Sequence, residues 1–95
     1  MSEREIVFSP RARERLEDIV EYLYGRHLSS EFVLKYVQQI ESWLERLLGT
    51  FPESGNLIPE FGEDVRRVVY KKYCFLYRIQ EDRIEILTVY RGNLP

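Results

Sequence analysis

The sequence predicts an α+β fold in which a helical hairpin packs on one face of a small, mainly antiparallel sheet. Three observations predict it: an alternating β-branched and aromatic stretch from Val65 to Arg91, two amphipathic segments before it, and a short apolar strand at the start. The expected order of elements is β-α-α-β-β-β. With 95 residues the chain can bury one core, so we expect residues 1–95 to form a single domain.

The first expected element is a short strand at Glu3–Phe8, followed at once by a helix. Ser9 and Pro10 favour a helix start, because serine is a good N-cap and proline loses no hydrogen bond in the first helical turn. This helix should end near Gly25. Its apolar side chains form one stripe at helical spacing, namely Ala12, Leu16, Ile19, Val20 and Leu23.

A second helix is expected from Ser29 or Ser30 to about Leu48, with Gly49 as its stop. Its apolar stripe comprises Val33, Tyr36, Val37, Ile40, Leu44 and Leu47, with Trp43 beside it. Because the turn between the two helices is short, they should pack antiparallel as a hairpin.

The segment Phe51–Gly62 contains two prolines and two glycines, so we expect it to be irregular. Leu57, Ile58 and Phe61 are expected to pin it to the body of the protein.

Three strands are expected between Val65 and Arg91, separated by tight turns at Lys71-Lys72 and Glu81-Asp82. With a two-residue second turn, the expected inner-face pairs are Ile79 with Ile84, Tyr77 with Ile86, Phe75 with Thr88, and Tyr73 with Tyr90. Val68 and Tyr70 join this face from the preceding strand. On the other face Arg78 is opposite Glu85, and this pairing of opposite charges supports the register.

The other face of the expected sheet is both apolar and basic. Its apolar members are Val65, Val69, Cys74, Leu76, Leu87 and Val89, and its cations are Arg67, Arg78 and Arg91. A face open to water should alternate to polar residues, and a sealed core should not carry arginines. We therefore interpret this face as a surface that another molecule covers.

The net charge of −2 hides an asymmetry between the two parts of the chain. Residues 1–63 carry seven Lys/Arg against twelve Asp/Glu, a balance of −5, whereas residues 64–95 carry seven against four, a balance of +3. A basic sheet on an acidic protein suits an acidic peptide or a nucleic acid equally well.

Several classes of site are not indicated. One cysteine and one histidine predict neither an internal disulfide nor a structural zinc site, and we expect no metal and no cofactor. His27 stands in the inter-helix turn without a partner at catalytic spacing, so no catalytic residue is assigned. No stretch resembles a membrane span or a signal peptide, so we expect a cytoplasmic protein that does not enter the membrane.

The order and spacing of four stretches resemble the ParE/RelE toxin superfamily of bacterial type II toxin–antitoxin modules over essentially the whole chain. These stretches are FSPRARERLEDIVEYL, IESWLERLLGTFPESG, GEDVRRVVYKKYCFLYRI and IEILTVYRG. The resemblance implies a compact toxin with a cognate antitoxin, whose C-terminal segment would wrap across the groove and sheet in a hetero-oligomer. Because the covered face is basic and apolar, we expect that segment to be acidic and amphipathic.

The superfamily contains two functional classes: ParE-like toxins inhibit DNA gyrase, and RelE-like toxins cleave mRNA on the ribosome. Many RelE-type nucleases carry an arginine where this chain has Cys74, and related catalytic residues would follow the last strand, where it has Gly92, Asn93 and Leu94. Without a general acid or base we favour the ParE-like branch, with gyrase as target and no enzymatic activity of its own. The ending VYRG resembles that branch, with Arg91 in place of its histidine. The alternative is a RelE-like mRNA endonuclease.

Six residues are predicted to bind a partner: Arg67, Leu76, Arg78, Leu87, Tyr90 and Arg91. A third functional class, an RNA-binding sheet that stacks bases on strand aromatics, ranks lower. The predicted register turns Tyr73, Phe75 and Tyr77 inward, away from any such ligand.

Overall fold

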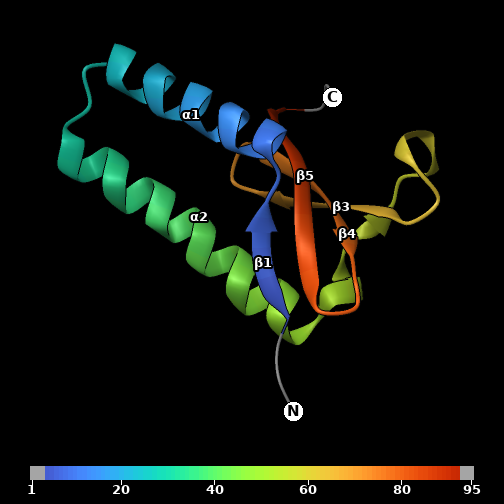
Figure 1. The fold of residues 1–95 in the computed structure, drawn as a ribbon. Coiled ribbons are helices and arrows are strands. Elements are labelled where there is room, and N and C mark those ends of the chain that lie inside the picture. The colour runs from blue at the N-terminus through green and yellow to red at the C-terminus, as the bar shows by residue number, and fades with distance from the viewer. Residues whose placement is uncertain (1–3, 93–95) are drawn as a thin grey trace.

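A computed structural model describes residues 4–92, and its architecture is two helices against one five-stranded sheet (Figure 1). The elements follow in the order β1 (Glu5–Phe8), α1 (Pro10–Gly25), α2 (Ser30–Thr50), β2 (Asn56–Leu57), β3 (Val65–Tyr70), β4 (Tyr73–Ile79) and β5 (Arg83–Arg91). The strands lie in the order β1-β5-β4-β3-β2. Only β1 and β5 run parallel, so the α+β class and the mainly antiparallel sheet are confirmed. The expected strand start at Glu3 and the tail at 93–95 lie outside the described residues.

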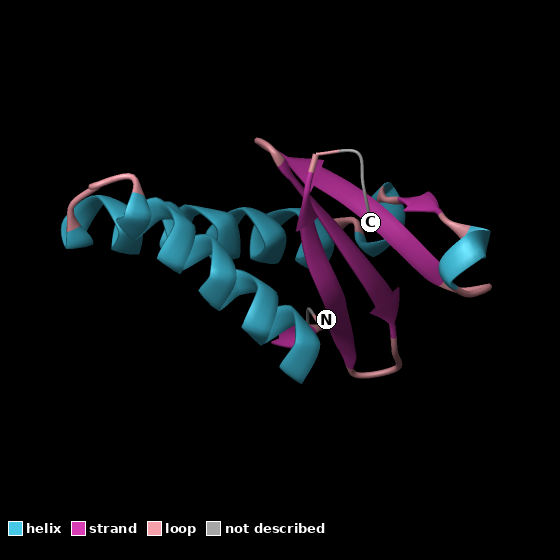
Figure 2. Ribbon diagram, turned by 90° about the horizontal axis from the view of Figure 1, so that it is seen from above, coloured by secondary structure: helices cyan, strands magenta, loops and turns pink. Residues whose placement is uncertain are grey.

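The two helices start where the sequence predicts. Ser9 caps α1 and Ser29 caps α2, each by accepting a hydrogen bond from a backbone N–H three residues on. The end predicted for α2 is wrong, because the helix continues through Gly49 to Thr50. Pro52 is the better explanation of this end, since proline disfavours helical backbone at the residue before it, here Phe51. The hairpin tip projects well beyond the sheet (Figures 1 and 2).

The core lies between the inner face of the sheet and the helices. Fully covered positions include Ile40, Leu44, Phe75, Tyr77 and Ile86. Tyr73, Phe75 and Tyr77 are at most 4% exposed, which confirms that the strand aromatics turn inward. Trp43 closes one edge, stacking on Tyr70 with their ring centroids 4.6 Å apart.

The predicted register is right for half of the β4–β5 hairpin. Ile79 pairs with Ile84, Tyr77 with Ile86 and Arg78 with Glu85. A β-bulge then inserts Leu87 as an extra residue, so that Phe75 pairs with Val89 and Leu76 with Thr88. The expected pairs Phe75–Thr88 and Tyr73–Tyr90 are therefore wrong.

Because of the bulge, the residues of β5 that follow it point to the opposite face of the sheet from the one predicted. Val89 was expected on the outer face but lies in the core, 1% exposed. Tyr90 was expected to face Tyr73 but is opposite Cys74, on the outer face. Arg91 was expected on the outer face but is opposite Tyr73, a core residue of the inner face. A one-residue slip has this effect because side chains alternate along a strand.

The segment between α2 and β3 is more ordered than the sequence predicts. It holds β2, which pairs with β3, and two short 3₁₀ turns at Pro52–Ser54 and Pro59–Phe61. Leu57 and Phe61 are 50% and 45% exposed, so their predicted anchoring role is wrong, whereas Ile58 is partly buried and its N–H donates to the Val65 carbonyl (2.9 Å). The anchor is Tyr77, whose hydroxyl donates to the Pro52 carbonyl (2.6 Å) and accepts from the Gly55 N–H (3.0 Å).

Candidate partner-binding groove

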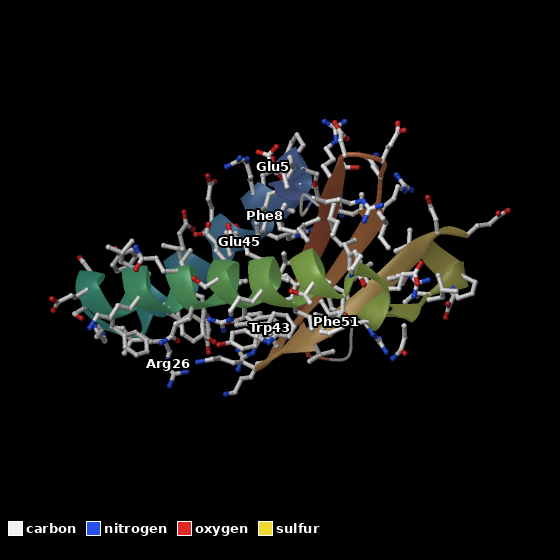
Figure 3. All side chains as sticks on the ribbon, turned by 90° about the horizontal axis from the view of Figure 1, so that it is seen from below. Glu5, Phe8, Arg26, Trp43, Glu45 and Phe51 are labelled. Atoms are coloured by element: carbon white, nitrogen blue, oxygen red, sulfur yellow. The ribbon has the colours of Figure 1, made fainter. Side chains whose placement is uncertain are left out.

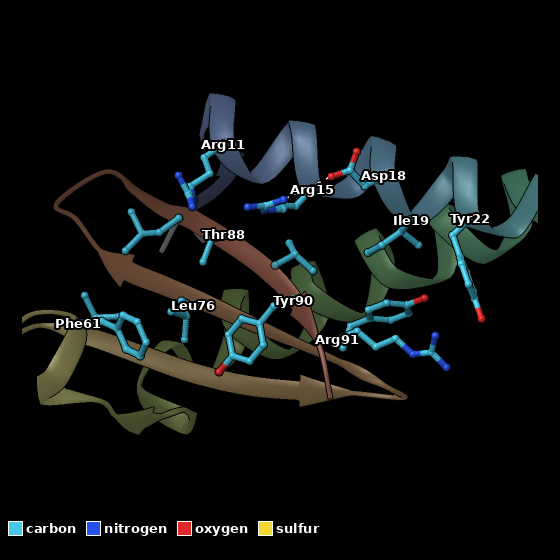
Figure 4. A pocket seen from close by; sticks show the side chains of 14 residues that line it. Arg11, Arg15, Asp18, Ile19, Tyr22, Phe61, Leu76, Thr88, Tyr90 and Arg91 are labelled. Atoms are coloured by element: carbon cyan, nitrogen blue, oxygen red, sulfur yellow. Dashed lines mark hydrogen bonds and ion pairs between the residues drawn. The ribbon is translucent and has the colours of Figure 1, made fainter. Parts of the chain in front are cut away.

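A groove of about 760 Å³ runs between α1 and the sheet, alongside the second half of β5 (Figure 4). One wall is α1, and the floor is formed by β4 and β5 with contributions from β3 and the turn before it. The lining residues are Arg11, Arg15, Asp18, Ile19, Tyr22, Phe61, Val65, Tyr73, Leu76, Leu87, Thr88, Val89, Tyr90 and Arg91. The groove therefore has an apolar floor and a rim that carries three arginines.

The wall is one face of α1. Arg11, Arg15, Asp18 and Tyr22 recur at intervals of four, three and four residues, which places them on one side of a helix. Arg15 and Asp18 form an ion pair of 3.4 Å, and Arg11 extends toward Thr88 (Figure 4). This wall was not predicted, because the sequence indicated a role only for the apolar stripe of this helix. The spacing of the two arginines and the tyrosine was the available signal.

The groove lining contains four of the six predicted partner-binding residues: Leu76, Leu87 and Tyr90 in the floor and Arg91 in the rim. The bulge contributes to it, because Leu87 and Thr88 follow one another and both line the groove. Leu76 is only 3% exposed, so it can offer little of its surface to a partner. Leu87 and Tyr90 are partly exposed and form the accessible part of the floor.

Tyr22 joins the wall to the end of β5. The Arg91 guanidinium carbon lies 5.2 Å from the centroid of the Tyr22 ring, a cation–π distance. On the other side, Arg26 donates a hydrogen bond of 2.9 Å to the Tyr22 hydroxyl. Arg91 and then Arg26 lower the pKa of Tyr22, because both cations favour its ionised form. The aromatic ring thus holds Arg91 at the mouth of the groove.

The other two predicted residues, Arg67 and Arg78, do not line the groove. Arg67 is on β3, and a side-chain hydrogen bond with Tyr90 raises the pKa of its guanidinium. The hydroxyl of Tyr90 points toward this strand (Figure 4). Arg78 Nε lies 3.0 Å from Asp64 Oδ2, but at an angle that makes no hydrogen bond, so its buried N–H has no acceptor among residues 4–92.

Less of the apolar outer face is exposed than the sequence predicts. Val65, Cys74 and Leu76 are 1%, 4% and 3% exposed without any partner, whereas Val69 is 55% exposed. Cys74 is packed inside the fold, and its Sγ donates a hydrogen bond of 3.0 Å to the Gly92 carbonyl. Much of the face is thus covered by the chain itself, and the groove is the part that stays accessible.

The titratable side chains that line the groove are arginines, tyrosines and one carboxylate. Its lining contains no histidine or cysteine, and its single carboxylate, Asp18, is paired with Arg15. His27 is exposed in the turn between the helices, outside the groove. Across residues 4–92, no three side chains of the metal-binding types gather at one place. Neither helix of that part has the length and apolar character needed to cross a membrane.

Comparison with known proteins places the chain in a family. The model of the family described as "ParE toxin of type II toxin-antitoxin system, parDE" matches residues 6–93. A solved structure titled "Chromosomal ParDE TA system from P. aeruginosa" has the same fold, with a TM-score of 0.74, 22% sequence identity, and coverage of 95% of this chain and 97% of that one. No curated protein sequence matches. The family model spans nearly the whole chain, and we conclude that this protein belongs to the ParE toxin family of type II toxin–antitoxin systems.

Proposed function

We propose that this ParE-family toxin acts by binding and inhibiting DNA gyrase, and that a cognate antitoxin neutralises it by occupying the groove. The observation that carries the proposal is the groove itself, which combines an apolar floor with an arginine rim. An inhibitor needs only a complementary surface.

The groove favours an acidic, amphipathic antitoxin segment. Apolar side chains of such a segment would pack on Leu87 and Tyr90, and its carboxylates would meet the arginines of the rim. Charge-assisted hydrogen bonds in a partly dehydrated interface are stronger than those between neutral groups. The toxin and antitoxin would then form a stable hetero-oligomer.

The six predicted residues take different parts in this proposal. Leu87, Tyr90 and Arg91 would contact the antitoxin directly, and Leu76 would support the floor beneath them. Arg67 would act beside Tyr90, and Arg78, which is paired with Asp64 and 36% exposed, would contribute its positive charge at the edge of the site. The α1 residues Arg11 and Arg15 join them as new members of the site.

Charge reversal tests the antitoxin part of the proposal. Arg67→Glu and Arg91→Glu should each weaken the toxin–antitoxin complex by about tenfold or more, measured by calorimetric titration. Arg13→Glu is the matched control, because Arg13 is exposed on α1 and does not line the groove. If Arg67→Glu and Arg91→Glu both bind the antitoxin as tightly as the wild type, with intact circular dichroism spectra, the antitoxin binds elsewhere.

A supercoiling assay tests the gyrase part. The purified toxin should inhibit supercoiling by gyrase, and addition of antitoxin should restore it. Removal of the chain from Gly92 onward should weaken inhibition, since this end continues from Arg91 at the mouth of the groove. In cells without antitoxin, the toxin should induce filamentation and the DNA-damage response before translation declines.

The rival function is a RelE-like mRNA endonuclease. Cys74 stands where many of those nucleases have an arginine, and here its thiol is buried and bonded to the Gly92 carbonyl. Mapping of mRNA ends on ribosomes tests this rival in the same cells. Codon-position-specific cuts that precede any change in DNA topology would refute the gyrase proposal.

A further inference from the structure

A second concave surface, the α2 basic patch, lies between α2 and the turn that joins β3 to β4. It is lined by Lys35, Gln38, Gln39, Ser42, Arg46, Tyr70 and Lys71, and encloses about 550 Å³. The α2 members recur at helical spacing and share one face, which the β3–β4 turn approaches with Lys71. Its cations are therefore contributed by two separate elements.

None of the three cations of the α2 basic patch is paired with an acid. Within residues 4–92, no carboxylate oxygen lies within 4.0 Å of Lys35, Arg46 or Lys71. Glu31 lies one helical turn before Lys35 on the same face, and Glu45 precedes Arg46, but neither forms an ion pair with these cations. Figure 3 shows Glu45 on the opposite side of α2 from Trp43. The patch thus holds three unpaired cations on a helix face that also carries Glu31.

Lys71 is held over the patch by its surroundings. Its Nζ lies 3.4 Å from Gln39 Oε1, and 5.0 Å and 5.5 Å from the ring centroids of Tyr36 and Tyr70. These are hydrogen-bonding and cation–π distances, which orient the ammonium group without neutralising it. The Lys71 backbone has a φ of 57°, a conformation that non-glycine residues adopt at a cost.

The chemistry of the lining distinguishes the α2 basic patch from the groove. A peptide-binding site usually offers apolar pockets for side chains. Here the lining consists of Lys, Arg, Gln, Ser and one Tyr, the residue types that contact phosphate oxygens of nucleic acids. Lys35 and Arg46 are eleven residues apart, which corresponds to about 16 Å along a helix and allows more than one phosphate contact.

We propose that the α2 basic patch binds the phosphate backbone of duplex DNA, without reading its sequence. The choice of duplex DNA rests on the proposed function, because gyrase holds a DNA segment that a bound toxin could also touch. The toxin would then contact the enzyme through the groove side and the DNA through α2, and inhibition would depend on both surfaces.

Fluorescence anisotropy with a labelled duplex of mixed sequence tests the site without gyrase. The wild-type chain should bind at low salt, and its affinity should fall as salt rises. The double variant Lys35→Gln/Arg46→Gln should bind about tenfold more weakly, with a salt slope shallower by about 2. The matched control Arg13→Gln/Arg83→Gln removes two exposed cations elsewhere and should keep the wild-type slope.

The outcomes separate the inference from the proposed function. No DNA binding by the wild-type chain, or equal slopes in both double variants, would overturn the inference. Loss of antitoxin affinity in Lys35→Gln/Arg46→Gln, without DNA binding by the wild type, would assign the patch to an acidic peptide instead. If the wild type binds DNA through the patch but does not inhibit gyrase, the DNA site stands and the proposed function fails. Unchanged gyrase inhibition by the patch variant would refute the role of the patch in inhibition.

Discussion

Replacement of Tyr77 by phenylalanine tests how the segment between α2 and β3 is fixed. The hydroxyl of this fully buried residue makes two hydrogen bonds, donating to Pro52 and accepting from Gly55. The Gly55 N–H is buried and loses its acceptor in the variant, which costs about 1–3 kcal/mol. With the lost bond to Pro52, the free energy of unfolding should fall by about 2–4 kcal/mol.

Urea denaturation followed by circular dichroism measures this change as a lower midpoint with an unchanged m-value. Tyr24→Phe is the control, because Tyr24 is 47% exposed and makes no side-chain hydrogen bond with residues 4–92. A loss below about 0.5 kcal/mol for Tyr77→Phe, the level of an ordinary surface change, would refute the assigned anchoring role.

The wild type and Tyr77→Phe should also differ in how their stability depends on pH. Burial raises the pKa of Tyr77 above its ordinary value of 10.0, because the ionised phenolate would lose its hydration. The unfolded chain therefore releases this proton at lower pH than the native state does, and stability falls as pH rises above about 10. Tyr77→Phe lacks the titrating group, so its difference from the wild type should shrink over that range. A difference that stays constant or grows would contradict the raised pKa.

Three further predictions concern the core, a helix cap and the groove. Leu44→Ala and Ile86→Ala remove fully buried side chains from opposing layers, and each should lower the free energy of unfolding by about 2–5 kcal/mol in urea titrations; a loss below about 1 kcal/mol would contradict that packing. Ser9→Ala removes both the α1 cap and a hydrogen bond to the Leu87 carbonyl, and should cost about 1–2 kcal/mol in the same assay, whereas an unchanged midpoint would show the cap to be dispensable. Arg11→Glu should weaken antitoxin binding in calorimetric titrations while Arg13→Glu does not, and equal effects would exclude α1 as a groove wall.

The elements that depend on local chemistry could be predicted from the sequence. Ser9 and Ser29 cap the two helices as expected, and the alternation in β3 and in the first half of β4–β5 gave the right faces. The bulge could not be predicted in this way, because Leu87, Thr88 and Val89 each suit either face of a strand. It occurs where Ser9 approaches from far away in sequence, donating through its N–H to Ile86 and through its hydroxyl to Leu87.

The candidate site was predictable in part. Leu76, Leu87, Tyr90 and Arg91 come together in the groove, although Tyr90 and Arg91 were each predicted on the opposite face of the strand. The wall of α1 was missed because an amphipathic pattern shows which face of a helix is buried but not what lies opposite its polar face. That information comes from the tertiary position of α1 beside β5.

Because β1 pairs with β5, β1 cannot take its place in the sheet until β5 has been synthesised. Ser9 and Leu87 are 78 residues apart in sequence, and contacts of such long range form slowly. During synthesis α1 has no β5 to pack on, so the wall and the floor of the groove cannot face each other in a shorter, growing chain. Whatever binds the groove, antitoxin or target, must therefore meet a chain in which β5 has already been synthesised and has paired with β1.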